Sequence, residues 1–313
     1  MATVLITGGT GLIGSAIAKE LLNKSYDVII LTRSPEKYSS TSRLTYAKWD
    51  IDKQTIDADA VAKADHIIHL AGEGVADKRW TQKRKKQIAD SRIKSSTLLV
   101  KALKENLNNV KVVVSASGIG WYGDSSLALS GEKGTESNPF DENDPATEDF
   151  LGTTCKEWET SIDPVSSLGK RLVKFRTGIV LSKEGGALPE FEKPLRFGLA
   201  TILGSGKQIM SWIHIDDLVR LYIIAIENER LHGVYNAVAP HPATNKKLII
   251  QLAKVMRGKF YIPIYIPSFI LKTVFGELSI EVLKSAAVSC KKIKAEGYSF
   301  LYPSLSAALH HVK

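Results

Sequence analysis

The feature that most constrains this chain is a glycine-rich stretch close to its start, Thr7 to Gly14, with the sequence TGGTGLIG. A short apolar run, Val4 to Ile6, comes directly before it. Behind it, Ile13, Ile17 and Leu21 recur every four residues, as they would on one face of a helix. This order of strand, glycine turn and helix is the context in which such spacing predicts a dinucleotide site.

Two glycines of this stretch have separate expected roles. Gly11 would let a pyrophosphate approach the backbone, and Gly14 would let the helix pack close to the strand. The free N–H groups and the positive end of the helix dipole would then face the phosphates. A glycine-rich turn without a ligand is the alternative, and the elements on both sides favour the dinucleotide.

The end of the second predicted strand bears on the choice between NAD(H) and NADP(H). The buried, β-branched run Asp27 to Thr32 predicts this strand, and Arg33 and Ser34 follow it. An NAD site carries an acidic residue here for the ribose 2′-hydroxyl. An arginine can instead form paired hydrogen bonds with a 2′-phosphate, which favours NADP(H). A surface arginine at a strand end is the alternative.

Length and composition set the broad class. The 313 residues suffice for one large domain with an appended lobe, or for two domains. No apolar run approaches the roughly 18 residues of a membrane span, and the early first strand leaves no room for a signal peptide. Two cysteines, Cys155 and Cys290, give neither a disulfide framework nor metal-ligand spacing. We expect a cytoplasmic protein without a metal or a membrane partner.

The chain is basic, with 42 lysines and arginines against 33 acidic residues and a net charge of +9. The cations are dispersed along the sequence apart from Lys83 to Lys86, which begins a predicted helix and is typical of a solvated helix face. A basic surface also attracts a polyanionic cofactor, so we expect no nucleic-acid partner.

Strands and helices alternate along the first half of the chain. Strands are expected over 27–32, 44–50, 66–72, 110–117 and 171–176, and helices over 81–107 and 148–162. This alternation predicts an α/β fold with a doubly wound parallel sheet, the Rossmann fold, whose ligands bind outside the carboxyl ends of the strands. The polar stretch 118–145 follows such an end and is expected to be functional or mobile. His69, inside an apolar strand, is expected to be a packed core residue.

The pattern changes beyond Val180, where glycines and prolines mark a long excursion. Residues 1–181, with 207–240 returning to them, are predicted to form the NADP-binding domain. Residues 182–206 and 241–313 are predicted to form a smaller, mixed C-terminal substrate lobe. Within it, Tyr261 to Pro267 is too rich in proline for a central strand.

The motifs of the Rossmann part resemble those of the short-chain dehydrogenase/reductase superfamily, in its extended NAD(P)-dependent epimerase/dehydratase branch. Besides Thr7 to Gly14, the resemblance rests on Leu70 to Gly72, Ser115 to Ser117, Tyr122-Gly123, Arg176 to Gly178 and Ile213 to Asp217. Within this branch the chain is similar to an atypical group called epimerase family proteins. That likeness rests on Ser91-Arg92, Cys155 to Glu159, Trp212 to Ile215, Val238 to Pro240, Thr244-Asn245 and Gly297 to Pro303.

The resemblance spans nearly the whole chain and implies contacts with NADP(H). Arg92 falls where many relatives carry an asparagine on the helix that lines the site, and Val180 where similar proteins offer backbone to the nicotinamide end. Together with the positions argued above, the expected cofactor contacts are Gly8, Thr10, Gly11, Leu12, Ile13, Gly14, Thr32, Arg33, Ser34, Leu70, Ala71, Gly72, Arg92 and Val180.

Catalytic residues of the superfamily are missing from this chain. Its members use a serine together with a tyrosine four residues before a lysine, whose charge lowers the pKa of the tyrosine hydroxyl. Gly152 and Glu159 align with the family's helix. That alignment places Leu151 at the tyrosine position and Cys155 at the lysine position, and neither side chain can replace the residue it stands for.

Three side chains are candidates for the missing chemistry. Ser117 matches the family's serine if one residue is inserted before Tyr122, which is the nearest phenol but is also found in relatives that keep the dyad. Asp149 could exchange a proton, or could be a helix-terminal acid favoured by the dipole. Lys156 adjoins the vacant position but points about 100° away from it, and Cys155 has no evident partner base.

Two functions of different classes follow. The first is an NADP(H)-dependent oxidoreductase or epimerase/dehydratase-like enzyme with a degenerate dyad, acting on an unknown small molecule. The second is a non-catalytic NADP(H)-binding sensor or regulatory protein. Relatives of the extended type often pair through the helices after their fourth and fifth strands, so a homodimer is expected.

Overall fold

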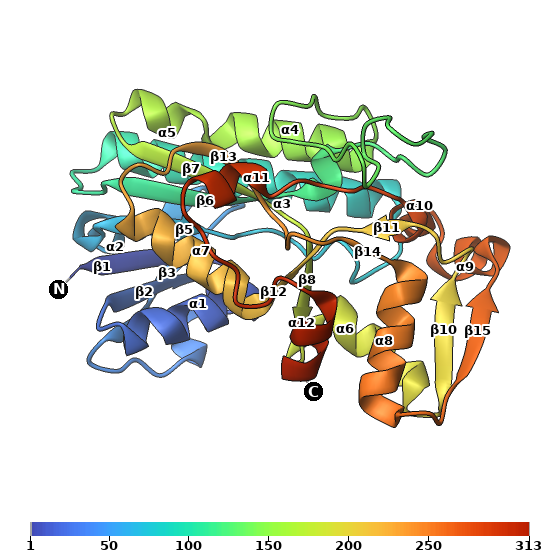
Figure 1. Ribbon diagram of the computed structural model, residues 1–313. Coiled ribbons are helices and arrows are strands. Elements are labelled where there is room, and N and C mark those ends of the chain that lie inside the picture. The colour runs from blue at the N-terminus through green and yellow to red at the C-terminus, as the bar shows by residue number, and fades with distance from the viewer. Residues whose placement is uncertain (1, 313) are drawn as a thin grey trace.

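Strand β1 (Thr3–Thr7) lies inside an eight-stranded sheet in the computed structural model, which describes residues 2–312 (Figure 1). The strand order is β13-β7-β6-β5-β1-β2-β3-β4, and every pair is parallel except β3 with β4. The other strands are β2 (Asp27–Thr32), β3 (Leu44–Asp50), β4 (Thr55–Ile56), β5 (His66–His69), β6 (Val112–Gly118), β7 (Arg171–Thr177) and β13 (Gly233–Ala237). The order reverses between β1 and β5, so ligands are expected beyond the carboxyl ends of these strands. The predicted doubly wound sheet is confirmed.

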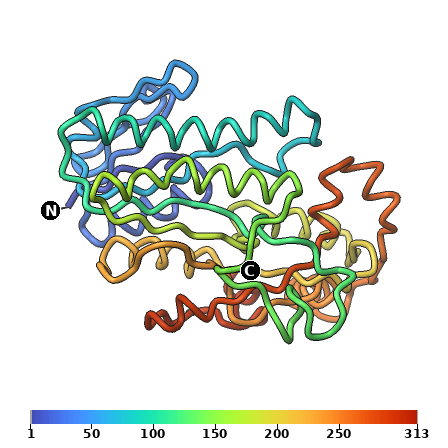
Figure 2. The backbone as a smooth tube through the Cα atoms, turned by 90° about the horizontal axis from the view of Figure 1, so that it is seen from above, coloured from blue at the N-terminus to red at the C-terminus, as the bar shows by residue number. Residues whose placement is uncertain are grey.

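Helices cover both faces of the sheet (Figure 1). One face carries α2 (Ala58–Lys63), α3 (Gln82–Glu105), α4 (Phe150–Ile162) and α5 (Pro164–Ser167), and Figure 2 shows α3 and α4 side by side. The other face carries α1 (Leu12–Asn23) and α7 (Ile215–Glu227). Successive side chains of β1 point to opposite faces of the sheet. Val4 and Ile6 pack with α1 and α7 on one face, and Leu5 packs with α3 on the other.

The connection from β2 to β3 is short and contains a 3₁₀ turn, η1 (Pro35–Lys37), instead of a covering helix. A cavity of about 410 Å³ lies there, between α1 and strands β2 and β3. The rings of Tyr38 and Tyr46 stack beside it at 4.8 Å, and it reaches the glycine loop at Gly9 and Thr10. This part of the sheet therefore stays open next to the loop.

The remaining strands form three small sheets. These are β8 (Ile179–Ser182) with β9 (Gly185–Gly186) and β12 (Trp212–His214), β10 (Leu199–Leu203) with β15 (Ile262–Ile266), and β11 (Ile209–Met210) with β14 (Ala243–Thr244). The helices beside them are α6 (Ala187–Leu195), α8 (Asn245–Arg257), α9 (Ser268–Phe275), α10 (Leu278–Leu283), α11 (Lys291–Ala295) and α12 (Leu305–His311). The proline-rich run is thus an edge strand of a two-stranded sheet, as its composition predicts.

The end of the chain returns to the main sheet. Val288, Ile293 and Tyr298 are buried in the same apolar cluster as β1, α1 and α7. The lobe residues of β10, α6, α8 and α12 form a separate cluster. The division into a Rossmann domain and a lobe stays a prediction. Across residues 2–312, no helix has the length and apolar character needed to cross a bilayer.

Most element boundaries agree with the sequence analysis. The strands over 27–32 and 44–50 are confirmed to the residue, and α3 and α4 begin and end within two residues of the predicted helices. The strand predicted over 66–72 is three residues too long, because β5 ends at His69. Beyond that point the N–H groups of Leu70 and Ala71 turn to the hydroxyl of Thr7.

Candidate cofactor and active site

The glycine loop joins β1 to α1 in the geometry that a phosphate site needs. Gly8 has a φ of +69°, and its carbonyl accepts a hydrogen bond from the N–H of Gly11 at 3.1 Å. Gly11 is the N-cap residue of α1 and, having no side chain, forms no capping hydrogen bond. Among residues 2–312, the N–H groups of Leu12, Ile13 and Gly14 find no hydrogen-bond acceptor. These groups at a helix N-terminus can bind an anion.

The segment after β5 packs directly against this loop. A side chain at Gly8 would lie 2.9 Å from the carbonyl of Leu70, so the two backbones touch. Thr7 Oγ1 holds the segment by accepting the N–H groups of Leu70 and Ala71 at 3.1 and 3.2 Å. His69 is fully buried and lies 2.7 Å from the same hydroxyl, which confirms the expected core histidine. The glycine loop and the segment from Leu70 to Gly72 therefore form one continuous surface.

The arginine predicted to select NADP(H) stands at the end of β2. Arg33 is exposed and forms no hydrogen bond or ion pair with any described residue, and Ser34 donates its N–H to Thr32 Oγ1 at 3.4 Å. The guanidinium is therefore free to meet a phosphate. Asp50, at the end of β3, accepts the N–H groups of Asp52 and Lys53, so its carboxylate serves a strand-end turn.

Two further predicted contacts reach the same edge from distant parts of the chain. The guanidinium of Arg92 lies against Gly72 and donates to the carbonyls of Glu73 and Ile88, both at 3.0 Å. Val180 lies in β8, whose hairpin with β9 meets the side chain of Leu12 at Gly185 and Gly186. Their contact with a cofactor stays a prediction; the fold brings Arg92 to Gly72 and the β8–β9 hairpin to Leu12 of the glycine loop.

Leu151 and Cys155 lie beside the end of β6, where the missing dyad would stand. Leu151 approaches Gly120, and the Cys155 sulfur lies 3.7 Å from the position of a side chain at Gly118. Burial raises the pKa of the Cys155 thiol to about 11, so it stays protonated at neutral pH. Leu151 belongs to an apolar cluster with Val75, Trp80, Ile88, Phe150, Leu278 and Val282. Leu151 therefore carries no exchangeable proton, and the neutral thiol of Cys155 supplies no positive charge.

Ser117, the serine expected to be catalytic, is engaged in a buried network. Its hydroxyl donates to Glu159 Oε1 at 2.7 Å. Arg176 binds both oxygens of the same carboxylate, at 2.8 and 3.1 Å, and Lys174 lies 3.7 Å from one of them. The network ties α4 to β6 and β7, and a catalytic role of Ser117 stays a prediction.

Tyr122 is fully buried and forms part of the same network. Its hydroxyl donates to Asn236 Oδ1 at 2.7 Å and accepts from Arg176 at 3.2 Å, while its ring stacks on Phe140. Burial raises the pKa of this phenol above its usual range. This geometry suits loop packing, and a catalytic role of Tyr122 stays a prediction.

Asp149 caps α4, accepting the N–H of Gly152 at 2.8 Å through Oδ1. Its other oxygen accepts a charged hydrogen bond from Lys284 at 2.9 Å. Lys284 is largely buried and also meets Glu281, whose carboxyl pKa is raised by burial and by the nearby Asp149. Sequence analysis missed Lys284 and Glu281 because 135 residues separate Lys284 from Asp149 and no local pattern links them.

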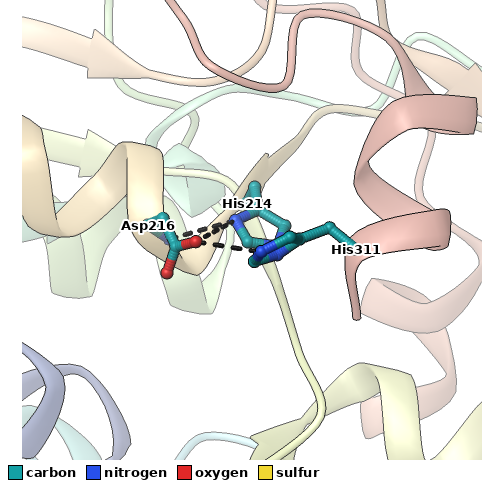
Figure 3. Close-up of side chains that lie close together, drawn as sticks. All are labelled: His214, Asp216 and His311. Atoms are coloured by element: carbon teal, nitrogen blue, oxygen red, sulfur yellow. Dashed lines mark hydrogen bonds and ion pairs between the residues drawn. The ribbon is translucent and has the colours of Figure 1, made fainter. Parts of the chain in front are cut away.

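Two histidines and an aspartate meet where α12 approaches the start of α7 (Figure 3). Asp216 Oδ2 lies 3.6 Å from His214 Nδ1 and 3.7 Å from His311 Nδ1. His214 Nδ1 accepts the N–H of Asp216, so the proton of a neutral ring is on Nε2, 3.3 Å from His311 Nδ1. This hydrogen-bonded pair joins the C-terminal helix to α7 and leaves His214 without a free nitrogen for a metal.

Comparison with known sequences identifies relatives along the whole chain. Residues 4–147 match the NAD dependent epimerase/dehydratase family, and residues 266–312 match a domain of unknown function. An epimerase family protein of Staphylococcus haemolyticus is 35% identical over 308 residues, covering 98% of each chain. One of Staphylococcus aureus is 34% identical over 309 residues, covering 99% of this chain and 98% of the relative.

Solved structures give the same picture. Human epimerase family protein SDR39U1 (isoform 2), crystallised with NADPH, superposes with a TM-score of 0.83 at 30% identity, over 99% of this chain and 98% of the human one. UDP-glucose 4-epimerase of Thermotoga maritima, with a TM-score of 0.77 and 20% identity over 98% of this chain and 96% of its own, shares the fold. This chain therefore belongs to the NAD-dependent epimerase/dehydratase family, as an atypical short-chain dehydrogenase/reductase of the epimerase family protein group.

Proposed function

We propose that this protein binds NADP(H) and uses it as an oxidoreductase or epimerase/dehydratase-like enzyme on a small molecule. The observation that carries the proposal is the row of free N–H groups at Leu12, Ile13 and Gly14, with the unpaired Arg33 at the end of the neighbouring strand. The human relative was crystallised with NADPH, which supports the same cofactor here. A cytoplasmic location and a homodimer belong to the same proposal.

The cofactor choice is tested with Arg33→Ala. Removing a charge-assisted pair to a 2′-phosphate costs about 1.5–3 kcal/mol, so the Kd for NADPH should rise about 10- to 100-fold while the Kd for NADH stays the same. Titration calorimetry measures both. Arg230→Ala is the matched control, since Arg230 is an exposed arginine near the amino end of β13, at the opposite edge of the sheet.

Either of two results would defeat this assignment. Equal weakening of NADH and NADPH by Arg33→Ala would mean that the guanidinium does not read the 2′-phosphate. Absence of heat with either coenzyme in the unaltered protein would remove the cofactor altogether.

For the enzymatic part of the proposal, Ser117 and Asp149 are the side chains that stand in for the lost dyad. Stopped-flow oxidation of NADPH against a set of carbonyl compounds measures turnover. A positioned acid–base group contributes about 10²–10⁴ in rate, so Asp149→Ala or Ser117→Ala should lower kcat by that factor without changing the Kd for NADPH. An unchanged kcat in both variants would exclude the side chains of Asp149 and Ser117 from the chemistry.

The second candidate function is a non-catalytic NADP(H)-binding sensor. Its supporting observation is that Leu151 carries no exchangeable proton and Cys155 no positive charge, while Ser117 and Tyr122 are held by Glu159 and Asn236. Tight NADPH binding combined with no turnover of any carbonyl substrate would favour this function over the enzyme.

A further inference from the structure

The surplus positive charge of this chain gathers in one lobe. Residues 193–215 and 241–276 contain nine lysines and arginines and no aspartate or glutamate, which equals the net charge of +9 of the whole chain. Because the two segments are separated in the sequence, their cations look dispersed along the chain. In the fold they lie together, because they supply β10, β15, α8 and α9 and the end of α6 (Figure 1).

Most of these cations have no acidic partner. Lys193 pairs with Glu190 at 2.6 Å, and Arg196 lies near Glu192 on the same helix. The other seven form no ion pair with any of residues 2–312; they are Lys207, Lys246, Lys247, Lys254, Arg257, Lys259 and Lys272. The lobe therefore presents unneutralised positive charge to its surroundings.

Large apolar side chains are exposed on the same elements. Phe197 is 83% exposed, Phe260 82%, Phe269 68% and Ile262 65%. Val274 on α9 is exposed too. In the β10–β15 sheet, Leu199, Thr201 and Leu203 pair with Ile262, Ile264 and Ile266, so these six side chains share one face. Ala200 and Ile202 face the other way, into the apolar cluster with α8.

We propose that this basic apolar face, made by β10, β15 and α9 with the adjoining Phe197 and Phe260, docks on the surface of an anionic lipid bilayer. Exposed aromatic and aliphatic side chains enter the boundary between headgroups and acyl chains, and the cations beside them, Arg257, Lys259 and Lys272, are attracted to anionic headgroups. The docking is peripheral, so it needs no membrane-spanning helix.

The charge distribution selects this occupant over two others. A second copy of the chain, paired through the same face about a two-fold axis, would bring the unpaired cations of both copies together. A nucleic acid would satisfy the cations but would gain little from the exposed Ile262, Val274 and Phe269, because phosphates and sugars offer no apolar phase. A bilayer with anionic headgroups meets both the charge and the apolar surface.

Vesicle sedimentation with the full chain tests the proposal. Vesicles of phosphatidylcholine, with and without phosphatidylglycerol, are pelleted with the protein over a range of salt concentrations. Binding should require phosphatidylglycerol and weaken as salt rises, because the headgroup attraction is screened. The double variants Phe260→Ser with Phe269→Ser, and Lys259→Glu with Lys272→Glu, should each weaken binding at least about tenfold.

Matched control variants carry the same changes elsewhere on the surface. Leu107→Ser removes a 94% exposed leucine at the end of α3, and Lys83→Glu with Lys104→Glu reverses two exposed charges on α3. These should bind vesicles like the unaltered protein. All variants should keep its melting temperature and its NADPH affinity, because none of the changed side chains is buried.

Several results would overturn the proposal. Equal binding to neutral and anionic vesicles, or no binding to either, would remove the lipid surface as partner. Retention by duplex DNA without vesicle binding would assign the face to nucleic acid. A monomer–dimer equilibrium that the double phenylalanine variant abolishes would assign it to a second copy of the chain.

Discussion

At the scale of single residues, Gly14 shows how sterics alone fix the glycine loop. A Cβ at this position would lie 2.3 Å from the Gly8 carbonyl oxygen and 2.6 Å from the Gly9 Cα. Both atoms are backbone, so they cannot move aside without displacing the loop. At Gly11 an added Cβ would lie 3.4 Å from its nearest neighbour, the Gly8 carbonyl oxygen, so the fold has room for a methyl group there.

We therefore expect Gly14→Ala to destabilise the protein by about 1–3 kcal/mol, the usual cost of overpacking, and to weaken NADPH binding because the loop shifts. Thermal melting and fluorescence titration measure the two effects. Gly11→Ala is the control: it should melt like the unaltered protein and still bind NADPH more weakly, since its methyl group would face the cofactor. Normal NADPH affinity in Gly14→Ala would contradict the packing argument.

His69 is the residue whose burial should make stability depend on pH. Complete burial lowers the pKa of its ring from 6.5 to about 4, and its two nitrogens lie 2.7 Å from Thr7 Oγ1 and 3.1 Å from Ser96 Oγ. The folded state therefore disfavours the charged ring, whereas the unfolded chain accepts the proton near pH 6.5. The stability contribution is complete above that pH and is lost as the pH falls towards 4.

The expected loss over this interval is on the order of 3 kcal/mol, at 1.36 kcal/mol per unit of pKa difference. Urea unfolding at a series of pH values measures it. His69→Gln should flatten the dependence, because a glutamine takes up no proton. An unaltered slope in that variant would assign the pH dependence to other groups.

At the scale of elements, Glu159 holds α4 against the sheet. Its carboxylate lies between Arg176 on β7 and Ser117 on β6, and all three side chains are buried. Removing one partner of a buried ion pair leaves the other charge without compensation. The pairing therefore holds α4 beside β6 and β7.

We expect Glu159→Gln to lower the free energy of unfolding by about 3–5 kcal/mol, as for other broken buried pairs. Ser117→Ala removes a single hydrogen bond from the same carboxylate and should cost only about 1 kcal/mol. Chemical denaturation of both variants gives the comparison. Equal losses would mean that the charge pair is not what anchors α4.

At the scale of the whole molecule, Asp217 fastens the C-terminal tail to the Rossmann part. This fully buried carboxylate at the start of α7 accepts the N–H groups of Leu301 and Tyr302 at 2.7 and 2.9 Å. The hydroxyl of Tyr298 donates to the same side chain at 3.2 Å. The tail thus closes over α7 across more than 80 residues of sequence.

Asp217→Ala should leave the N–H groups of Leu301 and Tyr302 without their acceptor, at about 1–3 kcal/mol each, and release the tail from residue 297 onward, although the Tyr298 hydroxyl keeps the backbone carbonyl of residue 217 as an acceptor. Limited proteolysis with mass spectrometry should show early cleavage in this segment, together with a lower melting temperature. Asp59→Ala, which removes an exposed carboxylate in the first turn of α2, is the control and should cleave like the unaltered protein. Equal cleavage of both variants would contradict the role of Asp217.

The sequence by itself determined the parallel sheet and the glycine turn between β1 and α1, because these depend on local patterns. Apolar periodicity, the positive φ of Gly8 and the contacts of Gly14 with Gly8 and Gly9 act within a few residues. The predicted loss of the dyad is of the same kind, because it rests on the identities of Leu151 and Cys155 alone.

Only the tertiary structure decided which partners the polar side chains have. Ser117 meets Glu159 across 42 residues, Asp149 meets Lys284 across 135, and neither distance leaves a pattern in sequence. The gathering of nine scattered cations on one lobe is of the same kind. Hydrogen bonds and charges act through space, so their partners are fixed only after the chain has folded.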